Sequence, residues 1–450
     1  MKQLLAQSKW ARWMALGIVS FTMMAAYFMT DVMSPLKGML EKTEGWSSAS
    51  YGLFTSAYGW FNVFLLMLFF GGLLLDKKGI RFTGTFAAAI MVAGAGVKYM
   101  ALAGVLPAQG ELAGVKSQVL LAAVGYAIFA VGAEVAGITV TKAIVKWFRG
   151  HEMALAMGLQ VAVARVGTAM ALVFSNPLAH HFGGVSHSVL FGLTLLAIGL
   201  LTFLIYALLD KKYDRQAGKI ATSTEDEFRL SDVKLVLTSY GFWLIALLCV
   251  LFYSCVFPFL KYATDLMVNK FCVNEEWAGL IPGLLPFGTI LLTPLFGSIY
   301  DKKGKGATIM IIGALMLVAV HALFSVPGIS SWVYALSLMV ALGVAFSLVP
   351  SAMWPSVPKI IPEKQLGTAY ALIFWVQNIG LMGVPYLIGV VLDRFCKVAP
   401  AEGAVSYDYT LPMLIFTAFA VLSVLVAVML KREDKRRAYG LEKPNASSRR

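Results

Sequence analysis

The chain has 450 residues, of which 59% are hydrophobic and only 14% are charged, and its formal net charge is +13. Soluble globular domains are about 45–50% apolar and about 25% charged, so this composition excludes an ordinary soluble enzyme, a disordered chain and a disulfide scaffold. A chain this apolar needs a bilayer as its solvent. Helices of about 20 residues with short loops would fit into its length about twelve times.

Apolar runs between polar breaks predict twelve membrane-spanning helices. In chain order they cover residues 11–33, 50–75, 81–106, 117–143, 153–180, 187–209, 239–264, 278–299, 306–326, 331–357, 366–392 and 408–430. We therefore predict an all-α membrane protein with two pseudo-symmetric six-helix bundles. Its predicted parts are the bundles 1–209 and 239–430, a cytoplasmic linker 210–238 and a basic cytoplasmic tail 431–450.

The basic residues are distributed unevenly between the two predicted sides of the membrane. With the N-terminus inside, the inner segments carry 28 Lys and Arg and the outer segments carry 8. Cytoplasmic loops hold the excess of basic residues in membrane proteins, so both termini are predicted to be cytoplasmic. The positive charge then reports orientation, and we expect no nucleic-acid partner.

A short motif occurs once in each half of the chain. Gly72-Leu-Leu-Leu-Asp76-Lys77-Lys-Gly follows the second span, and Gly297-Ser-Ile-Tyr-Asp301-Lys302-Lys-Gly follows the eighth. A repeat at the same loop of each half supports the division into six and six.

The motif suggests a gate at the inner surface. Asp76 and Asp301 can accept hydrogen bonds from the positive N-terminal end of a neighbouring helix, while the basic residues lie at the headgroups. Gly72 and Gly297 are expected to allow close helix packing. The predicted gating residues are Asp76, Lys77, Arg81, Asp301 and Lys302. With twelve spans, the paired motif resembles the signature of the major facilitator superfamily, which implies two parallel six-helix halves around a central cavity.

Two charged residues are predicted at the middle of the membrane, where each costs at least about 2.5–3.5 kcal/mol. Glu134 lies 12 residues before Lys146, and Arg165 lies 13 residues after Glu152. At 1.5 Å per residue, these spacings place both about 18–20 Å from the inner surface. The pair could be a buried salt bridge between the fourth and fifth spans. Alternatively, Arg165 binds a substrate carboxylate and Glu134 binds a substrate ammonium.

Weaker candidates for substrate binding are polar and aromatic residues in both halves. Singly, such residues more often pack helices together, but together they could line a cavity. They are Tyr58, Trp60 and Asn62 on the second span, Trp354 on the tenth, and Gln377 and Asn378 on the eleventh. Lys98, near the outer end of the third span, is a further charged candidate.

Three segments carry a closer resemblance. Residues 146–170 (KWFRGHEMALAMGLQVAVARVGTAM), 256–260 (VFPFL) and 352–381 (AMWPSVPKIIPEKQLGTAYALIFWVQNIGL) are similar to the lysosomal dipeptide uniporter branch of the superfamily. In that branch, the glutamate of a G-x-E string and the arginine of an A-R-[IV]-G string are implicated in binding peptide termini. They match Glu134 and Arg165, and the resemblance implies facilitated transport of dipeptides.

The predicted function is therefore transport of a small zwitterion, a dipeptide or an amino acid, by alternating access. Uniport is the default; a proton-coupled carrier or effluxer of other small organic solutes, and a non-transporting sensor or assembly factor, are the alternatives. No Walker A string, metal-ligand spacing or nucleophile–base set is found in the sequence, so we expect no cofactor, metal or enzymatic activity. Short outer loops and a tail sequon at Asn445 suit a bacterial inner membrane. We expect a functional monomer in contact with membrane lipid.

Overall fold

The computed structural model describes residues 8–106, 110–148, 151–217, 230–362, 365–398 and 406–444. Much of the predicted central linker and the last residues of the predicted tail lie outside this part. The chain divides into two compact units, Met1–Met33 with Ala57–Glu227, and Ser34–Ser56 with Phe228–Arg450. The connection between the first two long helices thus belongs to the second unit.

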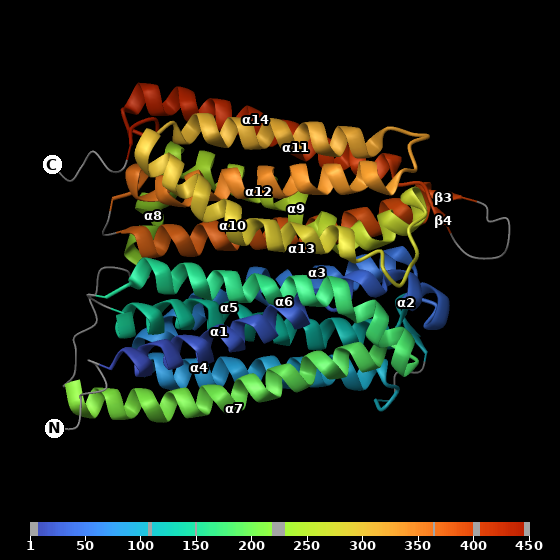
Figure 1. Ribbon diagram of the computed structural model, residues 1–450, viewed down its shortest axis with the longest axis horizontal. Coiled ribbons are helices and arrows are strands. Elements are labelled where there is room, and N and C mark those ends of the chain that lie inside the picture. Colours follow the sequence, from blue (N-terminus) through green and yellow to red (C-terminus); the bar gives the residue numbers. More distant parts are fainter. Residues whose placement is uncertain are drawn as a thin grey trace. The chain divides into compact units, whose positions relative to one another are not determined.

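The first unit is a bundle of long helices (Figure 1). It contains α1 (Lys9–Asp31), the part of α3 (Ser48–Phe64) from Ala57 onward, α4 (Met67–Leu102), α5 (Ser117–Phe148), α6 (Met153–Phe182) and α7 (Val185–Ala217). Strands β1 (Glu111–Leu112) and β2 (Val115–Lys116) pair antiparallel before α5. Helix α4 packs against α5 and α7, and α1 packs against α6 and α7.

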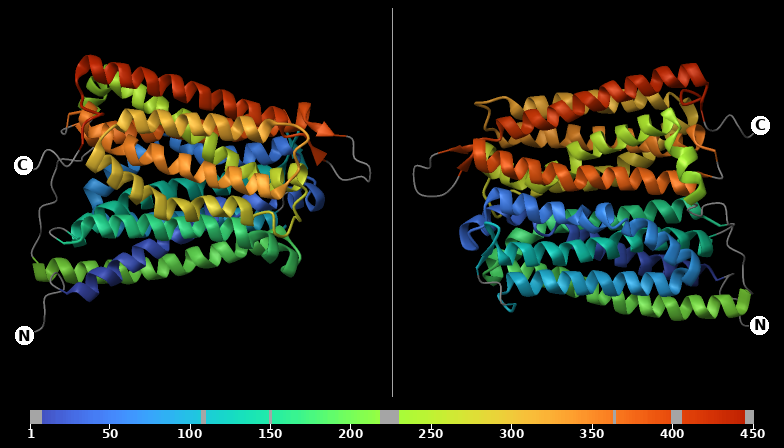
Figure 2. Two further views of the ribbon diagram at one scale, coloured as in Figure 1. Left: turned by 45° about the horizontal axis from the view of Figure 1, so that its top comes forward. Right: turned by 180° about the vertical axis from the view of Figure 1, so that it is seen from behind.

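The second unit is also helical, with α14 beside α11 in both Figure 1 and Figure 2. It begins with η2 (Ser34–Leu36), α2 (Lys37–Thr43) and the start of α3. The long helices are α9 (Tyr240–Phe271), α10 (Leu280–Lys303), α11 (Gly306–Ser325), α12 (Trp332–Ile360), α13 (Leu366–Phe395) and α14 (Thr410–Arg437). Helix α8 (Leu230–Leu237) and the antiparallel strands β3 (Lys397–Val398) and β4 (Ser406–Tyr407) complete it.

Eleven helices among the described residues are long and apolar enough to cross a membrane, so the prediction of an all-α membrane protein is confirmed. The second and third predicted spans are divided differently from the prediction. The chain breaks after α3 at Leu66, whose φ is 53°, and α4 then continues through a second break at Gly79, where φ is 77° and ψ is 173°. Hydropathy predicted this apolar stretch correctly but carried no signal for the break at Leu66.

Small residues let the helices of the first unit approach closely, although not where the motif suggested. A Cβ atom added to Gly94 of α4 would lie 2.3 Å from the Phe129 nitrogen, and one on Gly125 of α5 would lie 2.5 Å from the Lys98 nitrogen. Only glycine permits such backbone contact. The expectation for Gly72 and Gly297 was wrong, because open space surrounds both positions.

Candidate functional site

Glu134 lies half-buried on α5, and its carboxylate faces α3. The Tyr58 hydroxyl donates to Glu134 Oε1 at 2.9 Å. The Tyr58 ring in turn lies 5.7 Å from the ring of Tyr126, which precedes Glu134 by about two turns on α5. The structure therefore joins two residues that the sequence had proposed separately, Tyr58 and Glu134.

Arg165 lies half-buried on α6 and faces α1. Its guanidinium carbon is 5.6 Å from the centre of the Tyr27 ring, within the range of a cation–π contact. The close approach of the helices explains this placement, since a Cβ atom on Gly167 would lie 2.1 Å from the Met24 carbonyl oxygen. One residue further along, the Thr168 hydroxyl donates to Asp31 at 2.8 Å.

The two charged residues that the sequence predicted at the membrane midplane have separate partners. Both residues lie in the described part of the chain, yet no salt bridge joins Glu134 to Arg165 there; the glutamate is bound by Tyr58 and the arginine lies over Tyr27. Within the described residues, Glu134 of α5 and Arg165 of α6 therefore form no salt bridge with each other. One unit instead presents a carboxylate and a guanidinium on adjacent helices, each held by its own aromatic partner.

A third charge, Lys98 of α4, is fully buried in the same unit. Its ammonium donates to the Met29 carbonyl at 3.2 Å and lies 5.0 Å from the centre of the Tyr126 ring. Tyr126 therefore contacts both Lys98 and Tyr58, a role that sequence reasoning missed. Its position two turns before Glu134 on one helix was the available signal.

The other predicted residues of α3 behave differently from Tyr58. Trp60 is half-buried. Asn62 is buried, and its Nδ2 donates to the Tyr58 carbonyl of its own helix at 3.4 Å. Among the described residues, its Oδ1 has no hydrogen-bond partner. Asn62 therefore stabilises the turn of helix that carries Tyr58.

In the second unit, Trp354 of α12 belongs to an aromatic cluster. Its indole donates to the Tyr253 hydroxyl at 3.0 Å, and its ring stacks on Phe374 at 5.1 Å. Gln377 Oε1 accepts from the Cys249 thiol at 3.5 Å, and Asn378 Nδ2 donates to the Phe374 carbonyl at 3.0 Å. The predicted residues of this half thus share neighbours on α9 and α13. Sequence reasoning missed the cluster members Tyr253 and Phe374.

At the motif of the first unit, the structure replaces the predicted helix-dipole contact with ion pairs. Asp76 accepts from Lys142 of α5 at 2.6 Å. Arg81 binds Asp214 at 2.6 Å and Asp210 at 3.3 Å. Lys77 is exposed.

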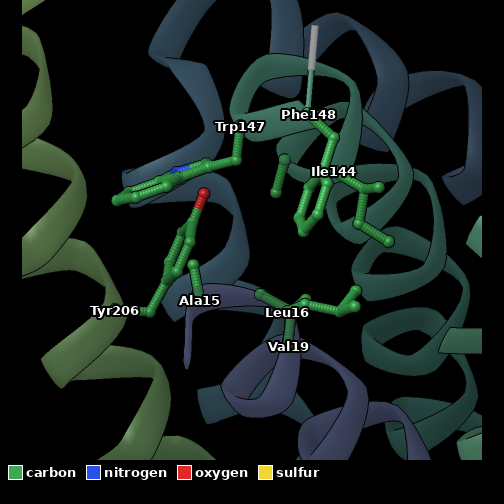
Figure 3. A pocket seen from close by; sticks show the side chains of 8 residues that line it. Ala15, Leu16, Val19, Ile144, Trp147, Phe148 and Tyr206 are labelled. Carbon is green, nitrogen blue, oxygen red and sulfur yellow. The ribbon is translucent and has the colours of Figure 1, made fainter. Parts of the chain in front are cut away.

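Asp210 is the centre of this ion-pair cluster, and the sequence assigned it to the linker. Helix α7 continues to Ala217, so Asp210 lies on the helix and is only 1% exposed. It accepts from Lys146 at 2.8 Å and from the Trp147 indole at 2.9 Å. Figure 3 shows the Trp147 and Tyr206 side chains beside a small apolar recess, which is lined also by Ala15, Leu16, Val19, Ala143, Ile144 and Phe148. Neither Glu134 nor Arg165 lines it.

At the motif of the second unit, residues 438–444 contact the loop between α10 and α11. Asp301 and Lys302 are exposed at the end of α10. Residues 438–444 pack against the loop that follows α10. The Lys305 amide of this loop donates to the Glu442 carbonyl at 3.0 Å. The Glu442 carboxylate accepts from the Thr308 amide at 2.8 Å and so caps α11. No sequence pattern predicted this contact within the predicted tail.

Comparisons with known proteins agree with this architecture. A family model described as Major Facilitator Superfamily matches residues 16–385. The lysosomal dipeptide transporter MFSD1 of Homo sapiens is 29% identical over 431 residues, which cover 93% of this chain and 85% of that protein. The protein of the same name from Gallus gallus is 32% identical over 318 residues, 68% of this chain and 67% of the relative.

Two solved structures share the fold. A bacterial homolog of the human lysosomal transporter Spinster, inward-facing and unoccupied, has a TM-score of 0.72 at 16% identity and covers 94% of this chain and 98% of its own. The nucleoside transporter NupG has a TM-score of 0.67 at 16% identity, with 92% of this chain and 98% of its own covered. At such identities the likeness concerns the fold alone.

Proposed function

Since this chain belongs to the Major Facilitator Superfamily and is an integral multi-pass membrane protein, we propose that it transports small zwitterions, dipeptides above all, by alternating access. The observation that carries the proposal is the separate placement of Glu134 and Arg165, which hold opposite charges on adjacent helices without a salt bridge between them. Charged residues within membrane spans are costly, and they are retained where they bind substrates or ions.

The roles follow from the chemistry of the two side chains. A guanidinium presents a planar fork of donors that matches a carboxylate, so Arg165 binds the C-terminal carboxylate of the peptide. A carboxylate accepts charge-assisted hydrogen bonds from an ammonium, so Glu134 binds the N-terminal ammonium. The Tyr58 hydroxyl continues to donate to Glu134 Oε1. MFSD1 relatives, which are named dipeptide transporters, support the choice of substrate.

Capped dipeptides test each role separately. A thermal-shift assay of the purified protein should register binding of a free dipeptide, and both N-acetylation and C-terminal amidation should weaken it. Charged hydrogen bonds contribute about 1.5–3 kcal/mol, so each cap should cost at least about 10-fold in affinity. Glu134→Gln should make binding insensitive to N-acetylation alone, and Arg165→Ala should make it insensitive to amidation alone. Arg394→Ala, an exposed arginine at the end of α13, is the matched control.

The rival transporter makes a different prediction. An effluxer of amphipathic solutes with Glu134 as its proton site would lose transport in Glu134→Gln and keep it in Arg165→Ala. A non-transporting sensor would give no flux in liposomes. Dipeptide flux that depends on both residues and is unchanged by an imposed pH gradient would support uniport.

The proposal includes the orientation of the chain, the membrane in which it lies and its oligomeric state. The excess of basic residues in the inner segments supports cytoplasmic termini, and the short outer loops support a bacterial inner membrane. We also propose that the transporter functions as a monomer.

A further inference from the structure

A second buried charge cluster lies in the second unit, at the end of that unit where α2, β3 and β4 lie (Figure 1). Lys37 of α2 is fully buried, and its ammonium binds Glu41 Oε1 at 2.8 Å and Asp265 Oδ2 of α9 at 2.9 Å. The two carboxylate side chains are 11% and 5% exposed. This cluster anchors the connection between α1 and α3 to the second unit.

Hydroxyl groups surround both carboxylates. Glu41 accepts from the Ser48 hydroxyl at 2.8 Å and from the Tyr407 hydroxyl of β4 at 3.1 Å. Asp265 accepts from the Tyr409 hydroxyl, which precedes α14. The Lys37 ammonium also lies 4.3 Å from the centre of the Tyr407 ring. These contacts satisfy hydrogen-bonding capacity, but none of them adds a positive charge.

The charged side chains next to this cluster form ion pairs with one another. Lys42 binds Glu275 at 2.5 Å, and Asp393 binds Lys397 at 2.9 Å and accepts from the Ala49 amide. Within the described residues, no second ammonium or guanidinium forms an ion pair with Glu41 or Asp265. One ammonium thus faces two buried carboxylates, and the cluster is neutral only when one carboxyl group holds a proton.

We propose that the Lys37–Glu41–Asp265 cluster is a proton-binding site, in which Glu41 takes the proton. An uncompensated buried charge is strongly unfavourable, and a proton on Glu41 leaves one carboxylate for the one ammonium. Glu41 is the more exposed of the two and so is reached more readily from water, while Asp265 keeps its ion pair with Lys37. The protonated, neutral cluster holds residues 34–56 in the second unit more firmly than the anionic cluster.

Thermal unfolding of the full-length protein across the range from mildly acidic to mildly alkaline pH tests this site. The proton-bound form is the stable one, so the wild-type melting temperature should fall as the pH rises through the titration of the cluster, by about 2–4 °C. Glu41→Gln keeps every acceptor contact at Oε1 and removes the extra charge. It should lack this step and melt above the wild type at high pH.

One control variant and one further variant test whether the pH-dependent step comes from this cluster. Glu275→Gln removes a carboxylate from the neighbouring, more exposed pair and should keep the wild-type profile. Asp265→Asn neutralises the other carboxylate and should also abolish the step. A step that survives in Glu41→Gln, or that is absent from the wild type, overturns the proposal. So does failure of both neutral variants to fold, because the neutral cluster should be the more stable one. The readout needs no transport, so it stands or falls separately from the dipeptide proposal.

Discussion

The two copies of the G-x-x-x-D-K-K-G motif share their Gly, Asp and Lys positions but have different neighbours. In the first unit, the loop is surrounded by ion pairs that converge on buried Asp210, with Lys142 bound to Asp76. In the second unit, the loop is covered by residues 438–444 of the same chain, whose Glu442 caps α11. The repeated motif therefore places the same charged residues in both loops. The residues that contact each loop differ, because they come from other segments of each unit.

The last glycine of each motif copy has a similar backbone conformation but different surroundings. Gly79 and Gly304 both have positive φ angles, 77° and 68°. A Cβ atom on Gly79 would meet open space, but one on Gly304 would lie 2.5 Å from the Glu442 carbonyl oxygen. The second loop thus tolerates its chain end only because it has no side chain at this position.

The largest effect is expected from Asp210→Ala. Removing the carboxylate leaves Arg81 and Lys146 near each other without their shared buried partner, and breaking a buried ion pair in this way costs about 3–5 kcal/mol. Thermal or denaturant unfolding measures the loss. Hydrogen exchange should rise around residues 77–83 and stay unchanged around residues 301–308.

Asp214→Ala is the matched control for Asp210. Asp214 contacts the same two cations, but its side chain is 29% exposed, and exposed pairs contribute about 0–1 kcal/mol. Equal losses in the two variants would contradict the view that Asp210 is the centre of the cluster.

Glu442→Ala should produce the opposite pattern of exchange. It removes the cap from the Thr308 amide, which costs about 0.5–2 kcal/mol, and it should increase exchange around residues 304–309 while leaving residues 77–83 protected. Lys443→Ala, at the exposed next residue, is the control. Unchanged exchange at α11 would mean that the chain end does not stabilise the second loop.

These contacts mark the limit of what the sequence could predict. Hydropathy located the helices because a bilayer requires every backbone group of a span to be paired within it, and depth along the helix selected Glu134 and Arg165. The family resemblance and the all-α membrane fold were confirmed.

The contacts between distant segments were not predictable in the same way. Pairing Tyr58 with Glu134 depends on how two helices are rotated about their axes, which spacing alone leaves open. Asp210 at the end of an apolar run has the same sequence signature whether the helix stops or continues. Glu442 and Thr308 are separated by 134 residues, so no local pattern connects them.

Substituting alanine at the two glycines compares the loops directly. Backbone conformations of this kind cost a non-glycine residue about 1–3 kcal/mol, so Gly79→Ala should lower stability by that amount. Gly304→Ala should lower it further, because its methyl group meets Glu442. In a chain shortened to end at residue 437, the two substitutions should cost the same; a persistent difference would assign the extra cost to the loop itself.

The smallest effect is expected at the Asp76–Lys142 pair of the first loop. Both side chains are partly exposed, at 24% and 29%, and such pairs contribute about 0–1 kcal/mol because water and salt screen them. A double-mutant cycle with Asp76→Asn and Lys142→Met measures the coupling free energy at low and high salt. A small coupling that high salt removes would assign the stability of this loop to Asp210. A coupling above about 2 kcal/mol that resists salt would instead make Asp76 a second structural anchor, and the loop would then be held at two points.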